Sequence, residues 1–208
     1  MGGFHGEMSQ ATAPELGGAA IKGAIEGAGV KNESIDEVIM GNVLSAGQGQ
    51  APARQASFKA GLSENVPAVT LNKMCGSGLK SVIYAHDQIK AGTSELVAAG
   101  GMESMTNAPY ISPKMRAGAR VGHQQMYDHM FLDGLEDAYE QGRLMGTFAE
   151  DTAELFQFTR EQQDDYAIGS LNNALNAQKK DAFDKEISPV IIKTRKGEVT
   201  IKEDEQPK

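Results

Sequence analysis

Over its first hundred residues the chain alternates between stretches of helical periodicity and short apolar runs. Apolar side chains recur three or four positions apart in the helical stretches, each of which ends at a glycine. The apolar runs between them have the length and composition of buried strands. Helices are predicted from residue 14 to 27–29, over 51–61 and from just after 75 to 92, and strands over 38–40, 66–71 and 95–99. This alternation predicts an α/β layered domain over residues 1–103.

The pattern changes after that domain. Residues 104–147 are rich in Pro, Gly, Met, Arg and His and show weak periodicity, with one helix expected over 134–143. So long an irregular region in a compact protein is typical of a functional excursion. Two helices are then predicted over 146–158 and 159–180, followed by a hairpin with strands over 189–193 and 198–201 and a turn at Lys196 and Gly197. We therefore expect a second region over residues 104–208.

Composition narrows the possible classes of protein. The 208 residues are 40% hydrophobic and 23% charged, which is ordinary for a globular chain that buries a sizeable core. No apolar run approaches the ~20 residues of a membrane span, and a single cysteine excludes an internal disulfide framework. We therefore expect no membrane partner and a location in the cytoplasm or another reducing compartment, with an organellar matrix left open. The formal charge of -8 argues against general nucleic-acid binding, so any anion site is local.

The only cysteine, Cys75, lies in the segment VTLNKMCGSGLKS, between a predicted strand and a predicted helix. A residue at such a junction stands at the carboxyl end of a sheet, as in a nucleophile elbow. The positive end of the helix favours the thiolate form, and backbone N–H groups there can bind an oxyanion. Glycine at 76 and 78 keeps the space beside the thiol free of side chains. Cys75 is thus a candidate nucleophile, the alternative being a buried cysteine that acts as a small hydrophobe.

The segment NKMCGSGLK resembles the acyl-cysteine segment of the thiolases, the acetyl-CoA acetyltransferases and 3-ketoacyl-CoA thiolases. Six further segments resemble thiolase segments in the order in which that family has them: EVIMGNVLSAGQGQAPARQASFKAGL, VAAGGMESMTNAPY, DGLEDAY, MGTFAED, TREQQDDYAIGSLNNA and EISPVIIKTRKGE. The resemblance covers nearly the whole chain. It implies a layered thiolase-like fold (α/β/α), with residues 1–103 as the N-terminal domain and 104–208 as part of the loop domain that covers the active site and binds CoA.

The resemblance also implies a reaction and its site residues. The reaction is a two-step Claisen condensation or its reverse, thiolysis, in which Cys75 attacks an acyl-CoA thioester and its own backbone N–H forms part of an oxyanion hole. Coenzyme A enters as part of the substrate, and no separate cofactor is expected. The other implied site residues are Asn72, Gly76 and Gly78, which shape the nucleophile loop, Leu135, which lies along the pantetheine path, and Met145, which lines the acyl pocket.

Residues 115–130 resemble the loop through which many thiolases form tetramers, so we expect a homo-oligomer, either a dimer or a tetramer. Leu144 stands where many acetoacetyl-CoA thiolases have histidine, which leaves the acyl-chain preference open. No metal is expected, because His123 and His129 lie six residues apart without a nearby carboxylate pattern.

Several family motifs are absent from the 208 residues. These are the Gly-His-Pro histidine, which activates the thiol, the second cysteine of Cys-x-Gly, the asparagine of an Asn-Glu-Ala-like motif, and the first β-strand with its Arg-Thr-Pro segment. We therefore expect the N-terminal portion of a thiolase, with little or no turnover by this chain alone. Two alternatives stay open: a catalytically silent thiolase relative that binds CoA or oligomerises, and a cysteine hydrolase that pairs Cys75 with His123 or His129.

Overall fold

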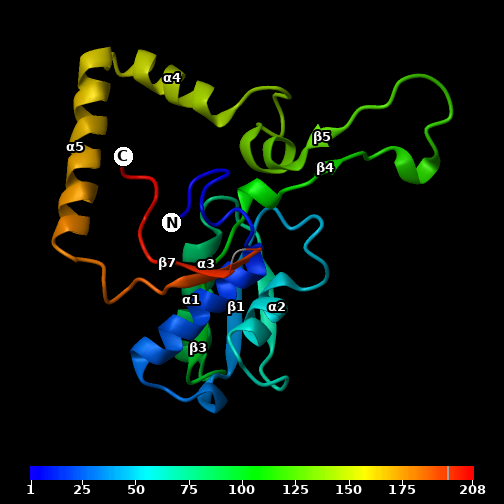
Figure 1. Cartoon of the computed structure of the whole chain (residues 1–208). Coiled ribbons are helices and arrows are strands. Elements are labelled where there is room, and N and C mark those ends of the chain that lie inside the picture. The colour runs from blue at the N-terminus through cyan, green and yellow to red at the C-terminus, as the bar shows by residue number, and fades with distance from the viewer. Residues whose placement is uncertain (196) are drawn as a thin grey trace.

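The computed structural model describes residues 1–195 and 197–208, and its centre is a parallel three-stranded sheet (Figure 1). The strands are β1 (Glu37–Gly41), β2 (Ala68–Leu71) and β3 (Val97–Gly101), in the order β2-β1-β3. Val38 of the central strand lies opposite Ala68 on one side and Ala98 on the other. The predicted alternation of helix and strand over this region is confirmed.

Strand β3 begins two residues later than the sequence pattern predicts, and Asp36 explains the difference. The backbone N–H groups of Glu95 and Leu96 donate to one carboxylate oxygen of Asp36, at 2.7 and 2.9 Å. These two residues therefore form a turn against the start of β1 before the strand ladder begins at Val97. The same two hydrogen bonds lower the pKa of Asp36, because they stabilise its charged form.

One face of the sheet is covered by α1 (Ala13–Ala28) and α2 (Pro52–Lys59), which pack on each other and on the strands. A Cβ at Gly18 of α1 would lie 2.6 Å from Lys59 Cβ, so glycine lets the two helices approach closely. Helix α1 ends at Gly29, which has a left-handed φ of 65°. The core of the domain lies on this face and consists of Ala13, Ile21, Ile25, Ile35, Val38, Met40, Ala53, Ala56, Ala60, Leu62, Val66 and Met102.

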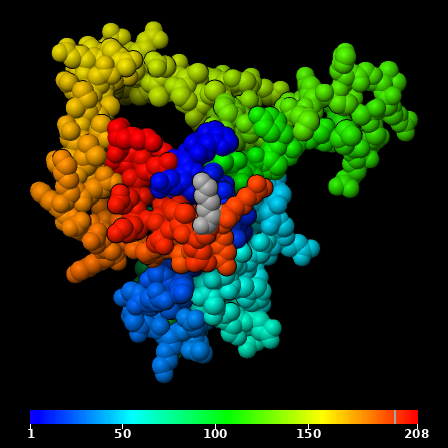
Figure 2. All heavy atoms as spheres, in the orientation of Figure 1, coloured from blue at the N-terminus to red at the C-terminus, as the bar shows by residue number. Residues whose placement is uncertain are grey.

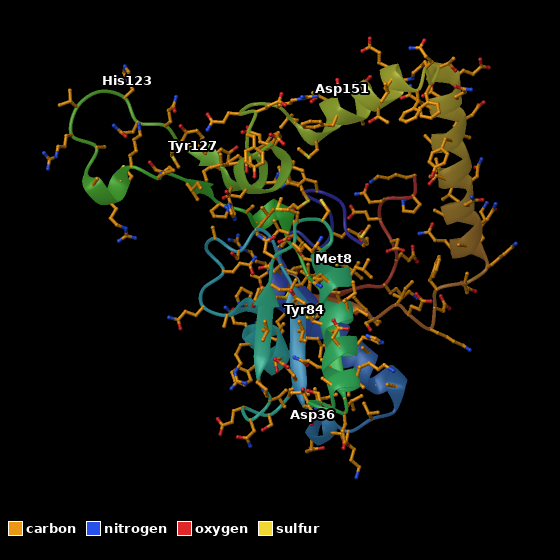
Figure 3. The ribbon with its side chains drawn as sticks, turned by 180° about the vertical axis from the view of Figure 1, so that it is seen from behind. Met8, Asp36, Tyr84, His123, Tyr127 and Asp151 are labelled. Atoms are coloured by element: carbon orange, nitrogen blue, oxygen red, sulfur yellow. The ribbon has the colours of Figure 1, made fainter. Side chains whose placement is uncertain are left out.

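The opposite face carries α3 (Ser77–Ala91), which packs on β1 and β3 and makes the domain a three-layer α/β/α arrangement. Figure 3, seen from behind, shows this helix in front of the sheet with Tyr84 on it. Its fully buried residues are small ones, Ser77, Ser81 and Ala85. The larger apolar side chains of α3 are partly or largely exposed, and Leu79 reaches 70%.

After β3 the chain leaves the sheet. A two-stranded arm of β4 (Tyr110–Ile111) and β5 (Tyr127–Asp128) projects to one side, and α4 (Met145–Leu155) and α5 (Arg160–Lys179) arch away on the other (Figure 1). The chain returns in an antiparallel hairpin of β6 (Val190–Thr194) and β7 (Gly197–Ile201), as predicted. In the predicted turn of this hairpin, Lys196 lies outside the described residues.

The helix predicted over 134–143 is wrong. A single π-helical turn, η4 (Phe131–Leu135), occupies the start of this stretch, and an irregular loop follows it. The carboxylate of Asp137 accepts hydrogen bonds from the backbone N–H groups of Tyr139 and Glu140, at 2.8 Å each. This side-chain capping offers the backbone an alternative to helical hydrogen bonds, which is a common behaviour of aspartate that apolar spacing does not reveal.

The ends of the described chain lie close together (Figure 2). The Glu205 carboxylate accepts hydrogen bonds from the backbone N–H groups of Gly3 and Glu7. The hairpin packs beside them through a small cluster of Ala11, Ile192 and Ile201. Across the residues that the structure describes, no helix has both the length and the apolar character needed to cross a membrane.

Candidate active site

Cys75 lies in a tight turn between the end of β2 and the start of α3, as the sequence predicts. We call residues 72–77 the cysteine turn. Strand β2 ends at Leu71, Gly76 is the N-cap residue of α3, and the helix begins at Ser77. Cys75 is a free, exposed thiol. It therefore stands at the carboxyl end of a parallel strand and beside a helix N-terminus, where backbone dipoles favour negative charge.

Two side chains hold the cysteine turn in shape. The Asn72 side-chain oxygen accepts a hydrogen bond from the Met74 backbone N–H at 2.9 Å. The Ser77 hydroxyl accepts from the Lys73 N–H at 2.8 Å and donates to the Met74 carbonyl oxygen at 2.6 Å. Met74 has a left-handed φ of 49°, a conformation that costs a non-glycine residue about 1–2 kcal/mol. These hydrogen bonds fix that conformation directly before Cys75.

The turn rests on the sheet through close backbone contacts at glycine. A Cβ at Gly41, the last residue of β1, would lie 2.5 Å from the carbonyl carbon of Ser77 and 2.7 Å from the backbone nitrogen of Gly78. A Cβ at Gly101, the last residue of β3, would lie 3.2 Å from the Gly78 Cα. The start of α3 is therefore pressed against the ends of two strands. The sequence pattern did not predict these two close contacts.

The fold itself does not require glycine at positions 76 and 78. A Cβ at Gly76 would meet only the Lys73 carbonyl oxygen, at 3.5 Å, and a Cβ at Gly78 would approach Gly101 no closer than 3.6 Å. Both are ordinary van der Waals distances. Internal packing thus leaves room for a small side chain, and the absence of one keeps the surroundings of the thiol open.

The two remaining predicted site residues lie in the second region of the chain. Leu135 is half-buried at the end of η4, and Met145 is the first residue of α4 and is 44% exposed. Segment 131–135 touches the first domain, because a Cβ at Gly134 would lie 3.2 Å from Leu44 Cδ2. Within the described residues, no hydrogen bond or ion pair links Leu135 or Met145 to the cysteine turn, whereas Asn72 belongs to that turn.

A buried polar cluster lies where the second region joins the sheet. The Glu103 carboxylate accepts hydrogen bonds from the backbone N–H groups of Val43 and Leu44, and from the Asn42 side chain at 2.7 Å. Burial raises the pKa of Glu103, although the two backbone hydrogen bonds act in the opposite direction. The Asn42 side-chain oxygen is buried and has no hydrogen-bond partner among the described residues. The cluster fixes the loop that follows β1, next to the junction with residues 104–147.

His129 belongs to the same junction and is 5% exposed. Its Nε2 accepts a hydrogen bond from the Ala46 backbone N–H at 3.3 Å, and its Nδ1 lies 2.6 Å from Asp133 Oδ2. Since Nε2 acts as the acceptor, Nδ1 carries the proton and donates it to the carboxylate. Both ring nitrogens are thus engaged away from Cys75. His123 lies on the far part of the β4–β5 arm (Figure 3).

Among the residues that the structure describes, no hydrogen bond pairs His123 or His129 with the cysteine thiol, and the hydrolase hypothesis gains no support. The described residues also contain no cluster of three or more His, Cys, Asp or Glu side chains placed to hold a metal ion. What the arrangement offers chemically is an accessible thiol on a rigid turn beside a helix N-terminus, a geometry suited to attack on a carbonyl carbon.

Comparisons with known proteins agree on one family. The model of the family described as "Thiolase, N-terminal domain" matches residues 1–208. An acetyl-CoA acetyltransferase of Cupriavidus necator is 52% identical over 206 residues, which cover 99% of this chain and 52% of that protein. An acetyl-CoA acetyltransferase of Saccharomyces cerevisiae is 47% identical over 211 residues, covering 100% of this chain and 53% of that protein.

A solved structure shows the same relationship in three dimensions. The crystal structure of the Bacillus anthracis acetyl-CoA acetyltransferase superimposes with a TM-score of 0.93 at 35% sequence identity. The superposition covers 100% of this chain and 52% of that one. The chain thus spans about half the length of the relatives that it matches.

Proposed function

The chain belongs to the thiolase family, and from that membership we propose that it supplies the acyl-accepting cysteine of a thiolase-type acyl-CoA acyltransferase. The observation that carries the proposal is the position of Cys75, an exposed thiol in a rigid turn between β2 and the N-terminus of α3. That position combines access for a thioester with backbone N–H groups that can stabilise an oxyanion. The relatives that match nearly all of this chain are acetyl-CoA acetyltransferases by name.

In the first step the Cys75 thiolate attacks the carbonyl carbon of an acyl-CoA thioester. A bond forms between Sγ and that carbon, the carbon–sulfur bond to CoA breaks, and CoA leaves as a thiolate that takes up a proton. The negative charge on the carbonyl oxygen in between is stabilised by backbone N–H groups, among which we include that of Cys75. The product is an acyl group carried on Cys75 as a thioester.

In the second step the acyl group leaves Cys75 for one of two acceptors. In condensation, an acetyl-CoA that has lost its α-proton attacks the acyl carbon through its own α-carbon, and the product is a 3-ketoacyl-CoA such as acetoacetyl-CoA. Thiolysis runs this sequence backwards: Cys75 attacks the 3-keto carbon of a 3-ketoacyl-CoA, the carbon–carbon bond to the acetyl-CoA portion breaks and that portion takes up a proton, and the free thiol of CoA then takes the acyl group from Cys75. Both directions regenerate the Cys75 thiol. Coenzyme A thioesters are the substrates, and the proposal needs no separate cofactor.

The second region of the chain binds the substrate in this proposal. We assign residues 1–103 to the domain that carries the nucleophile and residues 104–208 to the covering region. Leu135 lies along the pantetheine arm of CoA, and Met145 lines the pocket for the acyl chain. Gly76 and Gly78 keep the approach to the thiol open, which agrees with the absence of any packing requirement for glycine there. Asn72 keeps the turn in shape.

Turnover needs groups that these 208 residues do not contain. The Cys75 proton must pass to a base, and none of the four histidines lies in a Gly-His-Pro motif. The chain has no second cysteine for the α-proton. A general base typically speeds the chemical step about 10²- to 10⁴-fold over the same step without it. We therefore propose that the chain acts together with the remaining portion of a thiolase and has little or no turnover by itself.

The test combines a mass measurement with a complementation assay. The chain is incubated with acetyl-CoA, alone and with the portion of the Cupriavidus necator relative that it does not match, and acetoacetyl-CoA cleavage is recorded. We expect cleavage only in the mixture, and one acetyl group on Cys75 by intact-protein mass spectrometry. The Cys75→Ala variant controls both signals and should show neither. An acetyl group on another residue would overturn the role of Cys75, and full turnover by the chain alone would overturn the dependence on a second portion.

Binding of CoA without any acyl-enzyme in the mixture would favour the second candidate, a silent thiolase relative.

The exposed arm supports an oligomeric form for either candidate. Residues 115–126 contain the exposed apolar residues Met115, Val121 and Met126, and we propose that this arm joins copies into a dimer or tetramer in the cytoplasm or an organellar matrix. Light scattering on a variant in which a short Gly-Ser linker replaces residues 115–126 should show a smaller assembly, and an unchanged mass would contradict this role.

A further inference from the structure

We propose that Ser77 is a positioning residue for the Cys75 thiol. The inference rests on the proposed nucleophilic role of Cys75 and adds a residue whose hydroxyl group sets the reactivity of that thiol. Ser77 does not reach the substrate in this proposal. It acts through the backbone of the two residues that precede Cys75.

The first observation is the pattern of hydrogen bonds. The Ser77 hydroxyl uses both of its functions inside the cysteine turn, accepting from the Lys73 N–H at 2.8 Å and donating to the Met74 carbonyl oxygen at 2.6 Å. The Ser77 backbone N–H donates to the same carbonyl oxygen at 3.0 Å. Ser77 therefore makes hydrogen bonds to the backbone of Lys73 and of Met74, the two residues that precede Cys75.

The second observation is the backbone conformation of Met74, which these hydrogen bonds maintain. Met74 has φ +49°, a left-handed conformation that a non-glycine residue keeps only where its surroundings enforce it. Its side chain is 47% exposed and gives little packing support. The conformation of Met74 therefore depends on two backbone hydrogen bonds: its carbonyl oxygen accepts from the Ser77 hydroxyl, and its N–H donates to the Asn72 side-chain oxygen. Because Cys75 follows directly, the direction in which its side chain leaves the backbone depends on them too.

The third observation is that Ser77 is buried and closely packed. It is 4% exposed, and its backbone lies so close to Gly41 that a Cβ on the glycine would clash with it. The residue that carries the hydroxyl group is thus packed against the end of the central strand of the sheet. The cysteine turn is exposed, whereas the group that shapes it is buried, which is the arrangement expected of a rigid support for a reactive group.

Ser81 provides a matched control one turn further along α3. It is fully buried, and its hydroxyl also makes two hydrogen bonds to backbone, to the carbonyl oxygens of Gly78 and Gly100 at 2.6 and 2.7 Å. The bond to Gly100 joins the helix to β3, the bond to Gly78 lies within the helix, and neither enters the cysteine turn. Ser77→Ala and Ser81→Ala thus remove the same chemical group from the same helix, with comparable burial, and only the first changes the turn.

The experiment measures alkylation of Cys75 in the intact chain by two reagents, neutral iodoacetamide and anionic iodoacetate. In each case the thiolate sulfur displaces iodide and a carbon–sulfur bond forms. The ratio of the two rate constants reports how close the thiol lies to the positive N-terminus of α3, and a general loss of stability does not lower it selectively. Circular dichroism establishes that each variant is folded under the assay conditions.

We expect Ser77→Ala to lower the iodoacetate rate constant about tenfold and the iodoacetate-to-iodoacetamide ratio about threefold, with Ser81→Ala within about twofold of the unsubstituted chain in both. Equal effects of the two substitutions, or no effect of either, would overturn the role of Ser77. If Ser77→Ala does not fold, Asn72→Ala removes the other hydrogen bond to Met74 and should lower the ratio about twofold, and an unchanged ratio there would also overturn the inference. Neither reagent is an acyl-CoA, so a failure of acetyl transfer to Cys75 would count against the proposed function alone.

Discussion

Helices α1 and α3 cover opposite faces of the same sheet, and they differ in what happens to their apolar side chains. In α1, Ile21 and Ile25 are 4% and 5% exposed and pack into the main core. In α3, Leu79 and Ile83 are 70% and 42% exposed. Both helices show apolar residues at helical spacing, and both end at a left-handed glycine. The same sequence pattern thus corresponds to one helix whose apolar side chains are buried in a core and one helix whose apolar side chains remain exposed.

The difference shows how α3 is attached to the sheet. The residues of α3 that face the sheet are small, and the attachment consists of close backbone contacts at Gly41 and Gly101 together with the hydrogen bond from the Ser81 hydroxyl to the Gly100 carbonyl oxygen. Exposed apolar side chains that gather on one helix are typical of a surface that packs against another surface. For α1 the apolar side chains provide stability directly, whereas for α3 close approach to the sheet positions the cysteine turn.

The largest expected effect sharpens this comparison with one isoleucine from each helix. Ile25→Ala in α1 should lower the free energy of unfolding by about 2–4 kcal/mol, because it removes buried methyl groups and leaves a cavity in the main core. Ile83→Ala in α3 should lower it by less than about 1 kcal/mol, since that side chain keeps much of its contact with water. Urea unfolding followed by circular dichroism measures both. Equal losses would show that the exposed side of α3 is covered in solution.

A second prediction concerns the attachment of α3. Gly41→Ala places a methyl group against the backbone of Ser77 and Gly78, which cannot move aside as a flexible side chain could. We expect a loss of about 1–3 kcal/mol in the free energy of unfolding, together with slower alkylation of Cys75. Gly100→Ala is the control, because its methyl group would meet only the side chain of Met40, at 3.7 Å. A neutral Gly41→Ala would mean that α3 does not sit as closely on β1 as the structure has it.

A third prediction uses two glycines at the end of α1. Gly27 lies within the helix, and a Cβ there would meet nothing within 4 Å. Gly27→Ala should therefore raise the free energy of unfolding by about 0.5–1 kcal/mol, the usual gain when alanine replaces a glycine inside a helix. Gly29→Ala should lower it, because Gly29 ends the helix with φ +65°. Changes of the same sign would contradict the assigned end of α1.

The sequence predicted the alternating helices and strands of residues 1–103 and the place of Cys75, because both depend on local periodicity and on glycine at element ends. It did not predict the support of the cysteine turn. The contact between Gly41 and Ser77 joins residues 36 positions apart, and nothing in the local pattern of either segment reveals it. The loop after η4 was predicted as a helix for a related reason, since the capping by Asp137 depends on a side-chain hydrogen bond and not on spacing.

The left-handed conformation of Met74 is the clearest case of a feature that the local sequence pattern predicts only in part. Asn72 two residues before it is a local signal, because asparagine often accepts a hydrogen bond from the backbone two positions further along. Ser77 lies within the segment GSG, where the local pattern indicates a role for the two glycines and none for the hydroxyl group. Whether its hydroxyl points back into the turn depends on how α3 meets the sheet, which only the assembled fold determines.

The smallest expected change in stability tests the exposed side of α3 itself. Leu79→Gln exchanges a side chain that is 70% exposed for a polar one of similar size, so the free energy of unfolding should change by less than about 0.5 kcal/mol. The same change removes apolar surface beside the cysteine turn and should reduce self-association of the chain, measured by light scattering as a more positive second virial coefficient. Lys22→Gln on the exposed side of α1 is the control and should leave that coefficient nearly unchanged. A loss of several kcal/mol in Leu79→Gln would show that this leucine is already buried in the folded chain, and α1 and α3 would then no longer differ in the way that the structure describes.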